Sequence, residues 1–208
     1  MTREEKKAVT ALGRTVPKLT RSLIKPYRYK SIDGMVWTAQ SGMLFILSLF
    51  VSSPRGEDRV YVRASCETKP LFADDLLWDI LGFSENKSKP MSLRVNGAFA
   101  LYGIPVYEHR QELTALDEDH VAQLVQAELE EFSAFLASLS GREMVWFREL
   151  EEEQERYAYM EVMRPLLMLH DGKLDEALAY VTTHDVSCYI VNGKTVGQLI
   201  ETYCLDRA

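Results

Sequence analysis

Met43-Leu44-Phe45-Ile46-Leu47-Ser48-Leu49-Phe50-Val51 is the longest apolar run of the chain, and it decides the fold class. The run is far shorter than the roughly 20 apolar residues that a helix needs to span a bilayer. It is apolar at both odd and even positions, so a strand formed here requires cover on both faces, as a central strand does. We therefore predict the central strand of a sheet and no membrane anchor.

Strand-like segments lie on both sides of this run. Residues 35–40 precede it, and residues 59–66 follow it with alternating apolar and polar side chains. The connections contain Ser41-Gly42 and Ser53-Pro54-Arg55-Gly56, which are typical turn sequences. Because short turns join antiparallel neighbours, these segments predict an antiparallel meander.

The sheet is expected to gain two more strands after a short helix at residues 71–81. Asn96-Gly97 is the strongest turn signal of the chain, since both residues tolerate the positive φ of a tight hairpin. It predicts a hairpin between strands at residues 91–95 and 98–108. The expected sheet thus has about five strands.

Helices are predicted at both ends of the chain. Near the N-terminus, apolar residues recur at spacings of 3, 4, 3 and 4, with Pro17 expected to kink or divide the helix and Pro26 to end it. Beyond residue 113 the pattern is helical almost to the end, with capping boxes at Thr114-x-x-Asp117, Ser140-x-x-Glu143 and Thr195-x-x-Gln198 and a stop at Asp171-Gly172. The apolar stripe of the first C-terminal helix is Val121, Leu124, Val125, Phe132, Phe135, Leu136 and Leu139.

These segments predict an α+β fold: an antiparallel sheet of about five strands with an N-terminal helix and a C-terminal helical subdomain. Residues 1–112 form the helix plus antiparallel sheet, and residues 113–208 form the helical subdomain. The chain is 47% hydrophobic, which provides enough apolar material for the two parts to share one core.

Charge is distributed very unevenly along the chain. The first 30 residues hold nine Lys/Arg and two Asp/Glu, whereas residues 108–161 hold 15 Asp/Glu and four Arg, and the whole chain has a net charge of −7. The acidic balance argues against general nucleic-acid binding, which requires a basic surface. It favours another protein as partner, one that is itself basic.

The basic N-terminal segment has three interpretations. It contacts phosphates or lipid headgroups, or it is the solvated face of an ordinary helix, or it offsets the repulsion of the acidic helices. Sparse cysteines without a Cys-x-x-Cys pair, together with a charged N-terminus that lacks an apolar signal core, predict a cytoplasmic protein without a disulfide framework.

No motif of the chain predicts catalysis, a metal or a cofactor. Gly193-Lys194-Thr195 matches the end of a phosphate-binding loop, but Cys188 stands where that loop requires a glycine. His170-Asp171 and His184-Asp185 fall where helices are expected to end, and the helix dipole favours histidine there. Asp74-Asp75 is explained as well by the start of a short helix as by paired catalytic carboxylates.

Two candidate sites remain. The first is the acidic run, which is either a solvated helix face or a docking face for a basic protein; its residues are Glu149, Glu151, Glu152, Glu153 and Glu155. The second is a pocket between the sheet and the helices, which belongs to the alternative of a small-molecule-binding protein or an enzyme of unrecognised type. Its expected lining is Trp37, Tyr61, Arg63 and Tyr102.

The order of the predicted elements, together with one local segment, resembles that of known families. The segment is Lys25-Pro26-Tyr27-Arg28-Tyr29-Lys30, followed by Val36-Trp37-Thr38 and the apolar strand. The chain resembles bacterial domain-of-unknown-function families found near polymorphic-toxin and contact-inhibition loci, some of whose members are proposed immunity proteins. The resemblance is architectural and transfers no site residues. It implies a non-enzymatic protein-binding module of a bacterial cytoplasm, of the immunity type.

Overall fold

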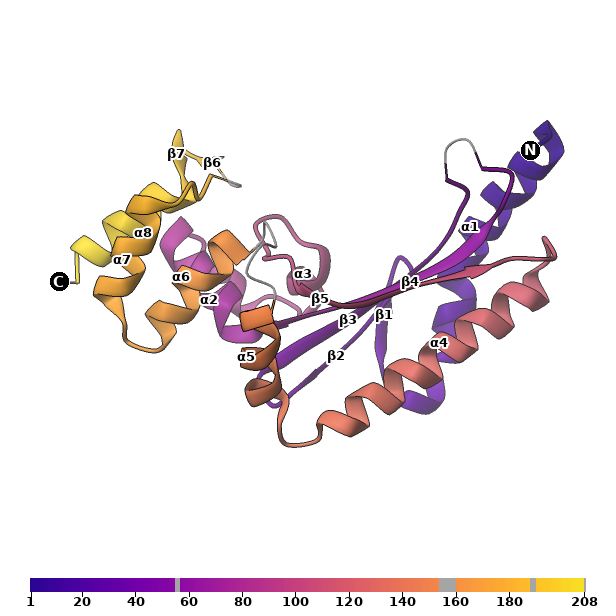
Figure 1. Ribbon diagram of the computed structural model, residues 1–208, viewed down its shortest axis with the longest axis horizontal. Helices are drawn as coiled ribbons and strands as arrows, with labels where there is room; N and C mark the ends of the chain where they lie inside the picture. Colours follow the sequence, from indigo (N-terminus) through magenta and orange to yellow (C-terminus); the bar gives the residue numbers. More distant parts are fainter. Residues whose placement is uncertain (55–56, 154–159, 188–189, 208) are drawn as a thin grey trace. The chain divides into compact units, whose positions relative to one another are not determined.

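The computed structural model describes residues 1–54, 57–153, 160–187 and 190–207, and it has the predicted α+β architecture (Figure 1). The chain divides into two compact units, each made of two separate segments. The sheet unit comprises Met1–Thr68 and Pro105–Glu143, and the helical unit comprises Lys69–Ile104 and Met144–Ala208. Both units therefore draw on both sides of residue 112, where the composition of the chain changes.

The sheet unit is built around a five-stranded antiparallel meander in the order β1-β2-β3-β4-β5. The tight turn between β2 and β3 gives them a simple register in which Trp37 pairs with Ile46. The last residues of β4 and the first of β5 belong to the helical unit. The strands are β1 (Lys30–Ile32), β2 (Met35–Gln40), β3 (Met43–Ser52), β4 (Tyr61–Pro70) and β5 (Ile104–Glu112).

The apolar run of residues 43–51 lies in β3, and β3 is the middle strand, as predicted. Its residues 43–47 are at most 1% exposed on either face of the sheet. Exposure rises only at the far end of the strand, where Phe50 is partly open to solvent. Burial of this continuous run supplies much of the hydrophobic free energy that holds the sheet unit together.

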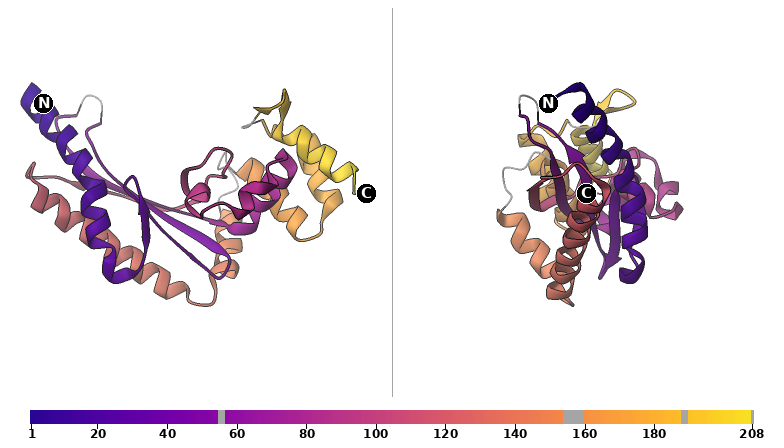
Figure 2. Two further views of the ribbon diagram at one scale, coloured as in Figure 1. Left: turned by 180° about the vertical axis from the view of Figure 1, so that it is seen from behind. Right: turned by 90° about the vertical axis from the view of Figure 1, so that its right-hand side faces the viewer.

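Helices α1 (Arg3–Leu23) and α4 (Glu118–Leu139) pack against each other, and α1 also packs on β3 (Figure 2). Thr2 and Glu5 form a capping box at the start of α1. Pro17 lies inside α1 without dividing it into two helices, and the buried residues Leu12 and Val16 before it and Thr20 after it lie on one side of the helix. A short 3₁₀ helix, η1 (Lys25–Tyr27), contains Pro26 and follows α1.

The predicted hairpin at Asn96-Gly97 is wrong. Its first strand is replaced by the short helix α3 (Ser92–Asn96), and β5 begins only at Ile104. Gly97 has an ordinary φ of −79°, and its N–H donates to the Leu93 carbonyl at 2.8 Å. A Cβ at Gly97 would collide with that carbonyl and with the Leu93 side chain, so glycine is required here by a close approach and not by a turn.

The helical unit contains five longer helices in its described residues. The predicted helix at 71–81 is confirmed as α2, which packs against α6 and α8. Gly172, at φ +75°, follows α6 as the predicted stop, and Thr195 and Gln198 form the predicted capping box of α8. The helices are α2 (Leu71–Leu81), α5 (Glu143–Glu153), α6 (Met160–His170), α7 (Leu174–Thr183) and α8 (Val196–Leu205), with the 3₁₀ helix η2 (Ser84–Ser88) and a ribbon of β6 (Ile190–Val191) and β7 (Lys194–Thr195).

The other two predicted helix starts lie a few residues from the real ones. Asp117, not Thr114, is the N-cap of α4, where its side chain accepts a hydrogen bond from the His120 N–H at 2.8 Å. Ser140 ends α4, and α5 begins at Glu143. No helix in the described part of the chain combines the length and hydrophobicity of a membrane span.

Candidate functional site

The acidic run lies on α5, and its members have different surroundings. Glu149, Glu152 and Glu153 are exposed. Glu151 is mostly buried, because its carboxylate lies 3.3 Å from the Arg148 guanidinium and 3.7 Å from that of Arg164. Glu155, also predicted, lies outside the described residues.

One side of α5 carries the exposed members of the run and one exposed apolar residue. Val145, Glu149, Glu152 and Glu153 follow one another at i, i+4, i+7 and i+8, which places them on the same side of the helix. Val145 is 58% exposed. We call these four residues the acidic face of α5.

The predicted pocket residues are divided between the two units. Trp37 lies on β2 and Tyr61 and Arg63 on β4 of the sheet unit, whereas Tyr102 belongs to the helical unit and is 52% exposed. Tyr61 and Arg63 are two residues apart and therefore share one face of the sheet. The prediction of a pocket with this lining stays a prediction.

The face that carries Tyr61 and Arg63 is a surface of charged and aromatic side chains that contact one another. The Arg63 guanidinium pairs with Glu108 and lies 5.5 Å from the centre of the Phe50 ring. Arg110 lies 3.8 Å from the centre of the Tyr61 ring. A second ion pair joins Arg110 to Glu57 at 2.6 Å, and hydrogen bonding to Arg110 lowers the pKa of Glu57. The cations of this face already have partners within the sheet unit.

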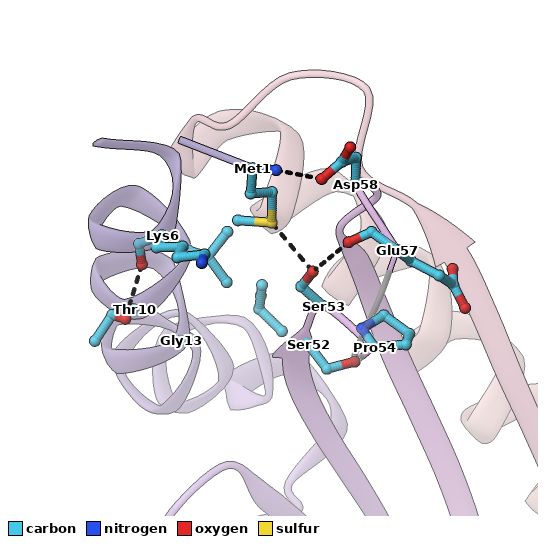
Figure 3. Close-up of a pocket in the computed structure, with 11 residues that line it drawn as sticks. Met1, Lys6, Thr10, Gly13, Ser52, Ser53, Pro54, Glu57 and Asp58 are labelled. Atoms are coloured by element: carbon cyan, nitrogen blue, oxygen red, sulfur yellow. Dashed lines mark hydrogen bonds and ion pairs between the residues drawn. The ribbon is translucent and has the colours of Figure 1, made fainter. Parts of the chain in front are cut away.

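A cavity of about 740 Å³ lies in the sheet unit between α1 and the end of β3 with the loop that follows (Figure 3). Lys6 and Thr10 line it from the helix, and Ser52 and Ser53 line it from the strand side. The Ser52 hydroxyl is buried and has no hydrogen-bond partner among the described residues. The remaining lining residues are Met1, Val9, Gly13, Val51, Pro54, Glu57 and Asp58.

Charged groups close one side of this cavity. The α-amino group of Met1 pairs with Asp58, and this hydrogen bond, with the attraction between the two charges, lowers the pKa of Asp58. The Ser53 hydroxyl lies 3.1 Å from the Met1 sulfur and 3.5 Å from the Glu57 carbonyl (Figure 3). The cavity is therefore lined both by apolar residues and by hydroxyl and charged groups.

The basic residues of α1 lie opposite its buried stripe. Arg3, Lys7, Arg14, Lys18 and Arg21 are all exposed and share one side of the helix. The neighbouring helix α4 carries five acidic residues, yet no ion pair joins α1 to α4 in the described ranges. All three interpretations of the basic segment stay predictions.

A cluster of three ligand-type side chains joins β5 to α4, and no motif predicted it. One nitrogen of His109 and one carboxylate oxygen each from Glu128 and Glu131 lie within 4.8 Å of one another. Gln111 donates a hydrogen bond to the other oxygen of Glu128. Glu128 and Glu131 are spaced i, i+3 on a helix, which is the one part of the cluster that the sequence could have indicated.

A second buried cluster lies in the helical unit and pairs a lysine with an aspartate. Lys69 and Asp74 are both 0% exposed, and the Lys69 ammonium lies 3.0 Å from the Asp74 carboxylate. The Leu101 backbone N–H donates to the same carboxylate at 2.8 Å, and Lys69 donates to the Leu101 carbonyl. The cluster fixes residue 101 to the start of α2, and Asp74 is a structural carboxylate at that position.

The cysteines and the other motifs have structural roles where they are described. Cys66 and Cys204 are free and buried, and burial raises the pKa of both thiols, which keeps them protonated and poorly nucleophilic at neutral pH. Cys188 lies outside the described residues. Gly193-Lys194-Thr195 forms the β6–β7 turn and the N-cap of α8.

The two His-Asp pairs also have local contacts. The His170 ring stacks on Phe72 at 3.5 Å, and the His184 ring stacks on Tyr180 at 4.1 Å. Asp171 accepts two hydrogen bonds from Arg148 at 2.8 and 2.9 Å. Both histidines lie at the ends of their helices, as the sequence predicted.

Comparison of the chain with protein-family models, curated proteins and solved structures gives no match.

Proposed function

We propose that this chain is a non-enzymatic protein-binding module of a bacterial cytoplasm, of the immunity type, and that the acidic face of α5 contacts a basic partner. The observation that carries the proposal is the composition of that face. Three exposed carboxylates, Glu149, Glu152 and Glu153, follow the exposed Val145 along one side of the helix. Protein interfaces commonly combine apolar and polar contacts.

The chemistry of the face defines the partner. Three carboxylates on a single side of a helix create a local negative potential that attracts a cationic surface and raises its association rate. Burial of Val145 in the complex then removes apolar surface from water. Glu151 is not part of the contact, because Arg148 and Arg164 already neutralise it inside the helical unit.

The test compares the wild-type chain with the triple variant Glu149→Lys/Glu152→Lys/Glu153→Lys. Immobilised wild-type chain should retain a basic protein from bacterial lysate at low salt and release it at high salt. The variant should lose that protein, and the association rate of the purified partner should fall at least about tenfold at low salt, because exposed charges act mainly on the on-rate.

A matched pair of single variants separates the docking face from net charge. Glu152→Lys and Glu85→Lys make the same change at exposed positions of the helical unit, but only the first lies on the acidic face. Glu152→Lys should slow association and Glu85→Lys should leave the rate within about twofold. Equal effects of the two variants, or unchanged binding by the triple variant, would contradict the proposal.

The cavity between α1 and β3 favours a second candidate function, the binding of a small molecule. Its volume of about 740 Å³ falls within the range of roughly 300–1,000 Å³ that ligand pockets occupy. The apolar lining would take an apolar body, and Lys6 with the unpaired Ser52 hydroxyl would take an anionic or hydrogen-bond-accepting group.

A dye with this chemistry tests the second candidate. Anilinonaphthalene sulfonate, an aromatic sulfonate, should bind the folded chain and fluoresce. Gly13→Leu should abolish this binding, because Gly13 lines the cavity and has open space beside it. Lys18→Leu, on the exposed side of the same helix, is the control. Equal dye binding by the wild-type chain and Gly13→Leu would contradict a ligand in this cavity.

A further inference from the structure

The cluster of His109, Glu128 and Glu131 between β5 and α4 has the geometry of a metal site. The Nδ1 atom of His109 lies 3.1 Å from Oε2 of Glu128 and 3.5 Å from Oε2 of Glu131. A tetrahedral zinc ion with bonds of about 2.0–2.2 Å holds its ligand atoms about 3.3–3.6 Å apart. The two distances from His109 are close to this spacing, and all three ligand atoms lie within 4.8 Å of one another.

The negative charge of the cluster also favours binding of a cation. Glu128 is only 1% exposed, and a second carboxylate, Glu131, lies beside the same imidazole. Neither carboxylate is paired with a lysine or an arginine within the described ranges. Desolvating a carboxylate without a compensating positive charge is costly, and a divalent cation between the two would compensate both.

The neighbouring side chains hold the ligands in place. Gln111 donates a hydrogen bond to the Glu128 oxygen that does not face His109. The Tyr107 ring stacks on the His109 imidazole, with their centres 4.6 Å apart. Metal ligands are commonly oriented by such supporting contacts. Glu131 is 54% exposed, so an ion can reach the cluster from solvent.

We propose that His109, Glu128 and Glu131 bind a first-row transition-metal ion, with Zn²⁺ as the best match. One imidazole and two carboxylates suit Zn²⁺, Mn²⁺ or Fe²⁺ better than Mg²⁺ or Ca²⁺, which prefer oxygen ligands alone. Three protein ligands leave a fourth position for water or for a group of a bound molecule. This inference is independent of the proposed protein-binding function, because it concerns the sheet unit and different residues.

The direct test is titration of the chelator-treated, dialysed chain with Zn²⁺, followed by calorimetry and thermal unfolding. The wild-type chain should bind one equivalent and unfold at a higher temperature when Zn²⁺ is present. Glu131→Gln removes one ligand charge at an exposed position, so the variant should fold normally and bind Zn²⁺ at least about tenfold more weakly.

Two further variants complete the test. Glu130→Gln makes the same change at the adjacent exposed residue and should bind Zn²⁺ as the wild type does. His109→Phe preserves stacking on Tyr107 and should lose both the bound ion and the visible absorption of Co²⁺ in the site. Failure of the wild type to bind Zn²⁺ at about 1 mM, or unchanged binding by Glu131→Gln, would overturn the proposal.

Discussion

The helical unit and the sheet unit each bury a carboxylate, but they compensate it differently. In the helical unit, Asp74 is compensated by Lys69 at 3.0 Å, by a backbone N–H, and by Arg94 at 3.9 Å. In the sheet unit, Glu128 has only an amide and an imidazole, with a second carboxylate nearby. A carboxylate with matched cations is a structural element, whereas one without them is where a ligand of opposite charge is expected.

The largest expected effect comes from breaking the paired cluster. Lys69→Met leaves the buried Asp74 with only the more distant Arg94 as a cation and should lower the free energy of unfolding by about 3–5 kcal/mol in urea denaturation at pH 7. The double variant Lys69→Met/Asp74→Asn keeps an acceptor for the Leu101 N–H and should recover about 1–3 kcal/mol of that loss. A double variant as unstable as the single one would show that charge is not the cause.

The loss caused by Lys69→Met should also depend on pH. Burial raises the pKa of Asp74 above its ordinary value of 3.8, despite the opposing effect of Lys69. A raised carboxyl pKa favours the folded state while the group is protonated, below the pKa of the unfolded chain, and that contribution is lost as pH rises through the folded pKa. Removing Lys69 raises the folded pKa further, so the penalty should shrink as pH falls from 7 toward 4.

A smaller loss of stability is expected from removing the carboxylate of Glu128, which has no lysine or arginine partner among the described residues. Glu128→Ala removes the acceptor of Gln111 and His109 and should cost about 1–3 kcal/mol. The loss should be smaller than for Lys69→Met, because the partly exposed His109 can turn to water. Glu128→Gln keeps the size and an acceptor and is the control. A penalty for Glu128→Ala as large as that of Lys69→Met would remove the distinction between the two clusters.

A third effect is expected from ion pairs of the helical unit that are partly exposed to solvent. Arg148 pairs with Asp171 and Glu151, but its side chain is 32% exposed. Solvent screens such pairs, so Arg148→Ala should lower the free energy of unfolding by only about 0.5–1 kcal/mol. The loss should decline in 1 M NaCl, whereas the loss from Lys69→Met should not. A salt-independent loss at Arg148 would indicate packing of its aliphatic part.

Two glycines, one in each unit, should respond to alanine with effects of opposite sign. Gly13→Ala in the sheet unit places a Cβ in open space within a helix and should stabilise by about 0.5–1 kcal/mol. Gly97→Ala in the helical unit drives a Cβ into the Leu93 carbonyl and should destabilise by more than about 2 kcal/mol. Thermal unfolding of both variants measures the difference, and equal signs would contradict this reading of the two sites.

The predicted hairpin at Asn96-Gly97 is wrong because of contacts with residues that are distant in the sequence. The dipeptide favours a hairpin locally, but the Arg94 guanidinium bonds to the Leu71 carbonyl and to Asp75 and lies 4.6 Å from the Trp78 ring. These contacts with α2 stabilise a helical turn at residues 92–96. No local pattern reports them, because their partners lie 16–23 residues earlier in the chain.

The buried side of α4 also includes a residue that the sequence pattern did not predict. The predicted apolar stripe contains most residues that the structure buries, including Val121, Val125 and Phe132. It omits Glu128, since a glutamate in a helix is ordinarily solvated. Glu128 is buried because β5 presents His109 and Gln111 to it, and this pairing depends on how α4 lies against the sheet.

The α+β class, the central strand β3, helix α2 and the cap of α8 could be predicted from the sequence, because burial periodicity and capping act over a few neighbouring residues. The folded structure was needed to show how residues 69–104 join residues 144–208, which acidic residues of α5 stay exposed, and which side chains meet at Glu128. Those features depend on contacts between residues far apart in the chain, which local sequence patterns do not report.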